Sequence, residues 1–540
     1  MAWLTGWSYR KKLTVDHSKV DSDCSDFPVK AIFDKDNFAF AHALETGNDV
    51  RFTSSDGETL LKYERELHQV FANPDGLLFD GTNDKVTCGD VSALDSASAL
   101  TVECRFIWMG GGTPYQPLVA KLPSNNSYNG FYLRLRTESG VAQFTGLGAD
   151  QSVSSTTTIL PGVEYHVAGV WTGTKMRIIV NGVQEAEIDS STNNPDAGTA
   201  ELEIGHIKPY LTDHWANTLH KEVRVWTVAK TESQINASKA YGAITGSEDD
   251  LECLYLFDEG SGTTLTDSAN SNNGTVSGAT WTTLPGYGVY HVKVPTASST
   301  SDTEFYCYYG KSDATDGADG ENVWDSNYAM VHHMGSSLLD STSNDNDGTN
   351  SGSTLGLARD GYFRSFDGSN DYIDLTGLTI ANTNDLSFEI MAQHGESAHL
   401  FDAQTGRWVI GWNLTDNLGV YYNSWFQVTT DIPADGGMHL VGVTLDQGTE
   451  RKIYIDDNSP DAAGSGPTVA IGGDVIMGAR YALNSAFYNG KMSEYRISTT
   501  LRSDAWIKAT HASLADTLLT YGAEEALTPT ARPRVMVVWA

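Results

Sequence analysis

The sequence predicts an all-β protein that contains one β-sandwich domain twice, together with a smaller β-sandwich that is discontinuous in the chain. Runs with strand-like alternation, such as VYHVKV at 289–294, recur along the 540 residues, and long helical periodicity is absent. Turn-forming Gly, Ser, Thr, Asn and Asp are abundant. One turn motif occurs twice, as FDGTNDK at 79–85 and as FDGSNDY at 366–372.

The repeated turn motif belongs to two copies of a longer domain. Its glycine, Gly81 or Gly368, can adopt positive φ, and the Asn and Asp that follow can hydrogen-bond their own backbone. Four further pairs of segments correspond in the same order: 100–103 with 386–389, 165–170 with 438–443, 176–181 with 451–456, and 203–205 with 476–478. Each copy ends in a polar, helix-like piece, at 231–240 and 502–512. The spacing is far too long for a solenoid, so this is a domain duplication.

The smaller sandwich is predicted from two separate segments, 1–70 and 286–324. Each has short alternating strands, but neither is large enough to form a core alone. We therefore expect them to pack together, with the first copy, 71–285, inserted in a surface loop between them. The second copy is expected at 325–525, and an extended tail at 526–540.

Composition excludes several classes of protein. The chain has 35 Lys and Arg against 69 Asp and Glu, a net charge of −34, which argues against nucleic-acid binding. It has no run long and apolar enough to insert in a membrane. The N-terminus lacks the apolar core of a signal peptide, so a complete chain would stay in the cytoplasm or leave by another route. Five cysteines, an odd number without a CxxC pair, argue against a metal cluster and against a dense disulfide framework.

Short motifs resemble two known families. Those of the small sandwich resemble the DUF2341 family, a β domain of unassigned function: GWSYRKK at 6–12, DFPV at 26–29, GNDVRFT at 47–53 and YYG at 308–310. Those of the copies resemble concanavalin A-like (laminin G-like, LamG) lectin/glucanase domains: FDGSNDY at 366–372, DSTSNDNDGT at 340–349, LFDEGSG at 256–262 and VRVW at 223–226. The resemblance implies two jelly-roll β-sandwiches. Both families occur in prokaryotic surface proteins and in tailed-phage virion proteins.

Catalytic motifs are weak. Glucanases of the resembled family use a Glu-x-Asp-x-x-Glu strand, whose acids can flank a glycosidic bond. The nearest match, EIDSST at 187–192, lacks the third acid, so we interpret Glu187 and Asp189 as solvent-facing strand residues. A serine-nucleophile elbow, a phosphate loop and a His-Glu-x-x-His motif are also missing. His332 and His333 form a lone pair, which we interpret as packing or chance and not as a metal site. The prediction is a non-enzymatic protein.

Calcium is the one predicted cofactor. It prefers six to eight oxygen ligands from carboxylates, amides and carbonyls. Asp340, Asn344 and Asp347 offer such oxygens in one loop, and Asp267 and Asn270 offer a weaker version in the first copy. The alternative is that these residues only form turns, and neither loop matches the EF-hand pattern.

A sugar site would need an aromatic face and a few fixed polar groups. Aromatic residues predicted to lie in loops are the candidates: Tyr115, Tyr128 and Tyr210 in the first copy, and Trp412, Tyr421, Tyr422, Trp425 and Tyr481 in the second. The alternative for each is burial in the core. Trp215 aligns with Phe487 and is interpreted as a core residue.

Three functions remain open. The first is a virion or extracellular surface protein, such as a tailed-phage tail or fibre component, that binds glycans or the host cell surface. The second is a structural decoration or spacer protein without sugar binding, and the third is a glucanase. In the first two, the apolar run at 535–539 would add a strand to its own domain or to another virion or surface subunit.

Overall fold

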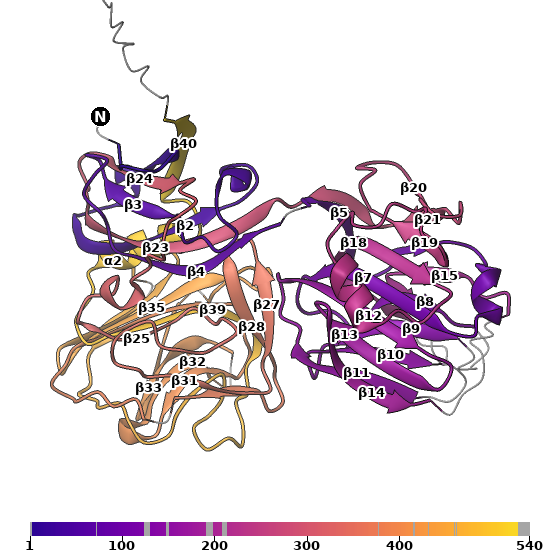
Figure 1. Ribbon diagram of the computed structural model, residues 1–540. Helices are drawn as coiled ribbons and strands as arrows, with labels where there is room; N and C mark the ends of the chain where they lie inside the picture. The colour runs from indigo at the N-terminus through magenta and orange to yellow at the C-terminus, as the bar shows by residue number, and fades with distance from the viewer. Residues whose placement is uncertain are drawn as a thin grey trace, which may run out of the picture.

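The computed structural model describes residues 3–71, 73–123, 130–146, 151–190, 198–207, 213–375, 377–413, 416–429, 431–457, 459–460 and 462–527. Over these residues the chain is nearly all β, as the sequence predicts (Figure 1). Its strands form three bodies: the small sandwich, the first copy at one side of it, and the second copy beneath it. In the described part of the chain, no helix has the length and apolar character needed to cross a membrane.

The small sandwich combines strands from distant parts of the chain. They are β1 (Tyr9–Val15), β2 (Cys24–Phe33), β3 (Arg51–Ser54), β4 (Tyr63–Val70), β23 (Gly286–Ala297), β24 (Thr303–Tyr309) and β40 (Leu519–Ala526). One antiparallel sheet has the order β3–β24–β1–β40, and the other has the order β2–β23–β4. Tyr9 pairs with Tyr309 and Val29 pairs with Val292. Segments 1–70 and 286–324 therefore pack on each other, as their small size led us to expect.

The end of the chain also belongs to the small sandwich. β40 pairs with β1, with Leu519 opposite Val15. It follows helix α2 (Asp504–Leu514), whose first turn is capped by Ser503. Most side chains of α2 are buried, because the helix lies between the small sandwich and the second copy, and its Trp506 ring contacts Phe27 at 4.9 Å. Residues 519–526, most of which we expected in the second copy, thus complete the small sandwich instead.

The first copy is a sandwich of two large antiparallel sheets around one apolar core. Its elements are β5 (Asp75–Asp80), β6 (Lys85–Thr87), β7 (Leu100–Trp108), β8 (Tyr115–Lys121), β9 (Phe131–Arg136), β10 (Val141–Gly146), β11 (Gln151–Thr158), β12 (Glu164–Trp171), β13 (Lys175–Val180), β14 (Val183–Asp189), β15 (Leu202–Ile204), β16 (His206–Ile207), β17 (His214–Trp215), β18 (Asn217–Trp226), α1 (Glu232–Ser238), β19 (Leu251–Tyr255), β20 (Thr264–Leu265), β21 (Gly274–Ser277) and β22 (Thr280–Thr283). One sheet has the order β11–β10–β9–β8–β15–β6–β21–β20 and the other β14–β13–β12–β7–β18–β5–β22, with β19 beside β18. A separate hairpin pairs β16 with β17.

The second copy repeats this arrangement. Its strands are β25 (Tyr328–His332), β26 (Thr349–Ser351), β27 (Thr354–Ala358), β28 (Gly361–Asp367), β29 (Tyr372–Asp374), β30 (Leu386–Ala392), β31 (His399–Ala403), β32 (Trp408–Trp412), β33 (Leu418–Tyr422), β34 (Ser424–Gln427), β35 (His439–Asp446), β36 (Glu450–Ile455), β37 (Ala462–Ser465), β38 (Val475–Met477) and β39 (Asn489–Ser498). The sheets have the orders β27–β28–β39–β30–β35–β36–β37, with β25 beside β39, and β26–β29–β38–β31–β32–β33–β34. In space these orders match those of the first copy, except that the sheet containing β38 has seven strands and the sheet containing β15 has eight, so β20 has no counterpart.

Short 3-10 turns connect some of the strands. They are η1 (His17–Lys19), η2 (Phe40–His42), η3 (Ser92–Ser96), η5 (Gly320–Asn322) and η6 (Thr405–Arg407).

The repeated turn motif carries the chain from one sheet to the other in both copies, from β5 to β6 and from β28 to β29. Its glycine has a φ of +84° in the first copy and +77° in the second. The Asp80 N–H donates to Asp84 Oδ2 at 2.8 Å, and the Asp367 N–H donates to Asp371 Oδ2 at 2.9 Å. The local hydrogen bonds that the motif predicts are therefore present.

Two adjacent connections join the first copy to the small sandwich. The Phe71 N–H donates to the Pro285 carbonyl at 3.0 Å, so the chain enters and leaves the first copy side by side. This geometry explains how a whole domain fits within one loop of another. A further backbone bridge, between Gly110 and Gly356, links the two copies.

Candidate functional site

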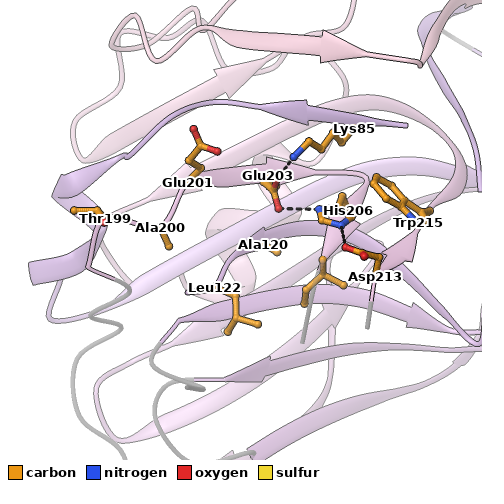
Figure 2. A pocket seen from close by; sticks show the side chains of 11 residues that line it. Lys85, Ala120, Leu122, Thr199, Ala200, Glu201, Glu203, His206, Asp213 and Trp215 are labelled. Atoms are coloured by element: carbon orange, nitrogen blue, oxygen red, sulfur yellow. Dashed lines mark hydrogen bonds and ion pairs between the residues drawn. The ribbon is translucent and has the colours of Figure 1, made fainter. Parts of the chain in front are cut away.

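The first copy has a cavity of about 590 Å³ on the outer face of the sheet that contains β15 (Figure 2). Glu203 faces this cavity because its neighbours Leu202 and Ile204 face the core, and side chains alternate along a strand. The β16–β17 hairpin brings His206 and Trp215 to the same place. The cavity therefore combines an acid, an imidazole and an indole.

A chain of ionisable groups crosses this cavity (Figure 2). Lys85 Nζ lies 2.6 Å from Glu203 Oε1, and Glu203 Oε2 lies 2.9 Å from His206 Nδ1. The other imidazole nitrogen, His206 Nε2, lies 3.0 Å from Asp213 Oδ1. Burial alone would raise the pKa of Glu203, but the hydrogen bonds from His206 and Lys85 outweigh it and lower this pKa. Glu203 is thus held as a carboxylate, which accepts hydrogen bonds.

Trp215 forms an aromatic wall of the first cavity. Its ring centroid lies 4.1 Å from that of His206, with 31° between the planes, and the side chain is half-buried. The interpretation of Trp215 as a core residue is wrong, because its neighbour Ala216 takes the core position and the hairpin turns the indole outward. Nearby polar residues, Glu203, His206 and Asp213, are the sequence signal that could have found it.

The second copy has a cavity of about 310 Å³ on the corresponding sheet. Trp412, Tyr421 and Trp425, three of the predicted aromatic residues, line it. Tyr421 and Trp425 are paired across β33 and β34, with ring centroids 5.6 Å apart. The Arg407 guanidinium lies 5.7 Å from the centre of the Tyr421 ring. Trp412 is buried and its Nε1–H donates to Asp431 Oδ1 at 3.1 Å, so its indole is held in a fixed position in the wall of the cavity.

The other two aromatic candidates of this copy are placed differently. Tyr481 lies beside the second cavity, with its ring 4.9 Å from the guanidinium of Arg407. Tyr422 packs against the apolar core of the second copy, because it follows Tyr421 on the same strand and side chains alternate there.

Of the three first-copy candidates, only Tyr115 is in the described part of the chain. Its ring lies 4.0 Å from the Arg134 guanidinium and meets the ring of His214 edge-on at 5.1 Å. Tyr115 therefore belongs to a cation–π stack next to the β16–β17 hairpin. Tyr128 and Tyr210 lie outside the described residues.

The two cavities correspond in one wall. The sequence aligns residues 203–205 with 476–478, and the segment after this strand forms a cavity wall in both copies. Those wall residues are His206, Asp213 and Trp215 in the first copy, and Arg480, Ser485 and Ala486 in the second. The other walls differ, because the first cavity is lined from β6, β8 and β15 and the second from β31, β32, β33 and β34. The chemistry differs, since the first cavity is rich in charged groups and the second in aromatic rings.

The loop predicted to bind calcium in the second copy is held by its own hydrogen bonds. Asp340 accepts from the Val331 N–H at 2.9 Å and from the Asn346 N–H at 3.0 Å, with one carboxylate oxygen each. Asp347 Oδ1 accepts from the Asp340 N–H at 2.8 Å. Asn344 Nδ2 donates to a backbone carbonyl of β25 at 2.8 Å. These contacts serve the turn, and calcium binding here stays a prediction.

The corresponding loop of the first copy has the same design. Asp267 accepts from the Leu254 N–H and the Asn272 N–H, both at 2.9 Å. Asn270 Nδ2 donates to the Leu251 carbonyl at 2.9 Å. In both loops one buried aspartate therefore accepts hydrogen bonds from backbone N–H groups of one strand and of the turn.

Glu187 and Asp189, the nearest match to a glucanase acid motif, lie on the outer strand β14 and are exposed. Glu187 forms ion pairs with Lys175 at 2.8 Å and Arg177 at 2.6 Å, and Asp189 pairs with Lys175 at 3.1 Å. The interpretation of both as solvent-facing strand residues is confirmed.

Comparison with known proteins identifies the repeated domain. A family model described as the concanavalin A-like lectin/glucanases superfamily (Laminin_G_3) matches residues 80–236 and 367–508, which together make up more than half of the chain. No curated protein matches the chain.

Several solved structures are similar to this chain. A candidate carbohydrate-binding protein from Bacteroides ovatus shares 18% identity and covers 52% of this chain and 94% of its own, with a TM-score of 0.32. Domains LG4-5 of the mouse laminin α1 chain share 12% identity and cover 79% and 91%, with a TM-score of 0.29. Domain 4 of an arabinanase from Geobacillus stearothermophilus, in complex with arabinotriose, shares 18% identity and covers 34% and 96%, with a TM-score of 0.28. From the family match over both copies, the chain belongs to the concanavalin A-like lectin/glucanase superfamily.

Proposed function

We propose that this chain is a non-enzymatic protein that binds glycans in the cavities of its two LamG-like copies. One observation carries the proposal: both copies have a cavity on the corresponding sheet in which a half-buried aromatic ring lies beside fixed polar groups. An aromatic face suits the apolar side of a pyranose, and charged groups hydrogen-bond its hydroxyls. In the first copy Trp215 and Glu203 would act in this way, and in the second Trp425 and Arg407.

The electrostatics of the first cavity favour binding over hydrolysis. A glycosidase needs an acid whose pKa is raised, with a second carboxylate across the scissile bond. Burial would raise the pKa of Glu203, but His206 and Lys85 lower it, which suits a hydrogen-bond acceptor and not a proton donor. Glu187 and Asp189, already neutralised by cross-strand ion pairs, offer no better acid.

Two sites in one chain would act together on a surface that carries many glycans. Once the first cavity is occupied, binding at the second becomes intramolecular, and the apparent affinity rises if both sites reach the same surface. This favours a role in attachment to glycan-coated cells over the capture of a single free sugar.

We place this activity in a virion or on a cell surface, with a tail or fibre component of a tailed phage as the first choice. The motifs at 6–12, 26–29, 47–53 and 308–310 support this, because they resemble the DUF2341 family. The tail at 526–540 would attach the chain to a neighbouring subunit; residues 528–540 lie outside the described residues.

A glycan array probed with the full chain tests the proposal. We expect binding to a restricted set of glycans, a loss of about tenfold or more with Trp215→Ala or Trp425→Ala, and a larger loss with both. Tyr372→Ala is the matched control, since this half-buried aromatic residue on β29 is outside the lining of both cavities.

The rival function predicts a different result. If the folded chain binds neither the array nor intact host cells, it is a structural decoration or spacer protein. If Tyr372→Ala lowers binding as much as the two cavity variants, the binding site lies elsewhere.

A further inference from the structure

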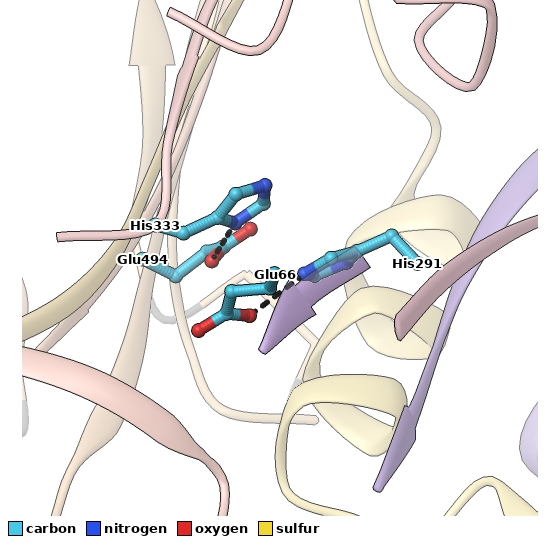
Figure 3. Close-up of side chains that lie close together, drawn as sticks. All are labelled: Glu66, His291, His333 and Glu494. Carbon is cyan, nitrogen blue, oxygen red and sulfur yellow. Dashed lines mark hydrogen bonds and ion pairs between the residues drawn. The ribbon is translucent and has the colours of Figure 1, made fainter. Parts of the chain in front are cut away.

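Two histidines and two glutamates meet in the interior, between the small sandwich and the second copy (Figure 3). Glu66 is on β4 and His291 on β23, whereas His333 directly follows β25 and Glu494 is on β39. Each residue offers one ligand atom, and these four atoms all lie within 4.8 Å of one another. We call these four residues the interdomain cluster. None of the four residues lines either of the two cavities described above, and none is one of the predicted calcium ligands.

Irregular strand pairing aims the two carboxylates at this cluster. Glu66 is the extra residue of a bulge in β4, since its neighbours Arg65 and Leu67 pair with consecutive residues of β23. Glu494 borders a second irregularity, between β30 and β39. A bulge turns a side chain away from the regular alternation of its strand, and bulges are frequent at functional sites.

The side chains of the interdomain cluster are buried, and each histidine lies within hydrogen-bond distance of a glutamate. His291 Nε2 lies 3.0 Å from Glu66 Oε2, and His333 Nδ1 lies 2.8 Å from Glu494 Oε2. The two imidazole rings are stacked 4.2 Å apart. Their side chains are between 0% and 8% exposed. His291 Nδ1 is buried and has no hydrogen-bond partner among the described residues.

The surrounding charges leave an excess of negative charge. Four buried or largely buried carboxylates belong to this region: Glu64, Glu66, Glu389 and Glu494. Two fixed cations oppose them, Lys30 at 3.6 Å from Glu66 and Arg496 at 2.7 Å from Glu494. The buried Arg502 also interacts with Glu389, but its charge is offset by Asp325 at 2.9 Å. Neither oxygen of Glu389 has a hydrogen-bond partner in the described part of the chain. With neutral imidazoles, which metal binding requires, two negative charges remain, and one divalent cation balances them.

We propose that the interdomain cluster binds one zinc ion, which fastens the small sandwich to the second copy. Two imidazole nitrogens and two carboxylate oxygens are ligands that zinc accepts in a four-coordinate site. Calcium and magnesium prefer oxygen ligands alone, so nitrogen from His291 and His333 selects against them. The ligands come from two domains that must dock to form the site, so zinc binding stabilises the docked arrangement. The sequence interpretation favoured packing or chance over a metal site for His333; this proposal makes His333 a metal ligand.

Metal analysis of the full chain tests the proposal. The chain is produced with zinc sulfate in the medium, desalted and measured by inductively coupled plasma mass spectrometry. We expect about one zinc per chain, and below about one fifth of that in His291→Gln and His333→Gln. His439→Gln is the control, because this histidine pairs with Asp435 and Asp456 instead, and it should keep its zinc. Metal-stripped wild type should gain thermal stability from zinc sulfate and not from magnesium sulfate.

Several outcomes overturn the proposal. A zinc-saturated wild-type chain with less than about one tenth of an ion, and no change of Tm with zinc, means that the interdomain cluster is only an ion-pair network. Zinc retained by both folded histidine variants means that the metal binds elsewhere. If the variants do not fold, the stoichiometry and Tm shift of the wild-type chain decide.

Discussion

Arg10 and Glu525 form an ion pair, with 2.7 Å between Nη2 and Oε2, although they come from opposite ends of the chain. The Arg10 side chain is only 7% exposed, and its guanidinium lies 4.3 Å from the centre of the Tyr306 ring. The pair joins β1 to β40 within one sheet. The small sandwich, which begins the fold, therefore depends on the last described strand.

Removing β40 should destabilise the protein. A chain that ends at residue 518 loses the pairing of β1 with β40, the buried side chain of Leu519 and the Arg10–Glu525 pair. We expect a cost of about 3 kcal/mol or more in unfolding free energy of the small sandwich, seen as a lower Tm by differential scanning calorimetry.

A chain that ends at residue 527 is the control for this truncation. It keeps all of β40 and should keep the wild-type Tm, while losing its place in the assembly if the tail is the attachment element. Equal melting of the two truncated chains would show that β40 contributes little to stability.

Glu203→Gln should weaken glycan binding by the first copy. The substitution removes the carboxylate that accepts from Lys85 and His206, and we expect a loss of about tenfold in affinity, measured by calorimetry with a glycan found on the array. Glu201→Gln is the matched control, because Glu201 lines the same cavity but is exposed. A greater loss with Glu201→Gln would place the ligand at the rim of the cavity.

Calcium should stabilise the second copy if the Asp340 loop binds it. Metal-stripped wild type would then gain in Tm on titration with calcium chloride, and Asp340→Asn would not, because a ligand that binds only the native state stabilises it. The zinc variant His291→Gln should still respond to calcium, which separates the two metals. An unchanged wild-type Tm, with no calcium by elemental analysis, would show that Asp340 only accepts the hydrogen bonds that hold the turn.

Acid should destabilise the first copy partly through His220. Burial lowers the pKa of His220 to about 4, although its hydrogen bond to the Leu118 carbonyl at 3.2 Å favours the charged form. The unfolded chain takes up this proton near pH 6.5, so stability falls as the pH drops from there toward 4, by about 2 kcal/mol at pH 5.

His220→Gln should remove that part of the pH dependence. Urea unfolding at pH 7.5 and at pH 5, followed by tryptophan fluorescence, gives the difference for each chain. Carboxylates that titrate in both chains contribute equally to both pH dependences, so their contribution cancels when the variant is compared with the wild type. Identical pH dependence in wild type and variant would show that His220 is not the titrating group.

The repeated turn was predictable because its chemistry is local. The glycine with positive φ and the Asp371 carboxylate that accepts from the Asp367 N–H lie within a few residues of each other, so the motif alone determines the local structure of the turn. The aromatic candidates were harder to interpret. Trp412, Tyr421 and Trp425 share a cavity, but Tyr422 packs on the core, since only strand alternation decides the side on which a ring lies.

The sequence alone determined the all-β architecture, the duplication and the split of the small sandwich. These features follow from the alternation of apolar and polar residues, from turn residues and from repeated motifs, which are all visible in the linear sequence. Only the tertiary structure decided that β40 completes the small sandwich, that Trp215 faces a cavity, and that Glu66, His291, His333 and Glu494 meet. These relationships depend on how distant strands pair, on where bulges redirect side chains, and on how two domains dock. A linear pattern does not specify such long-range geometry.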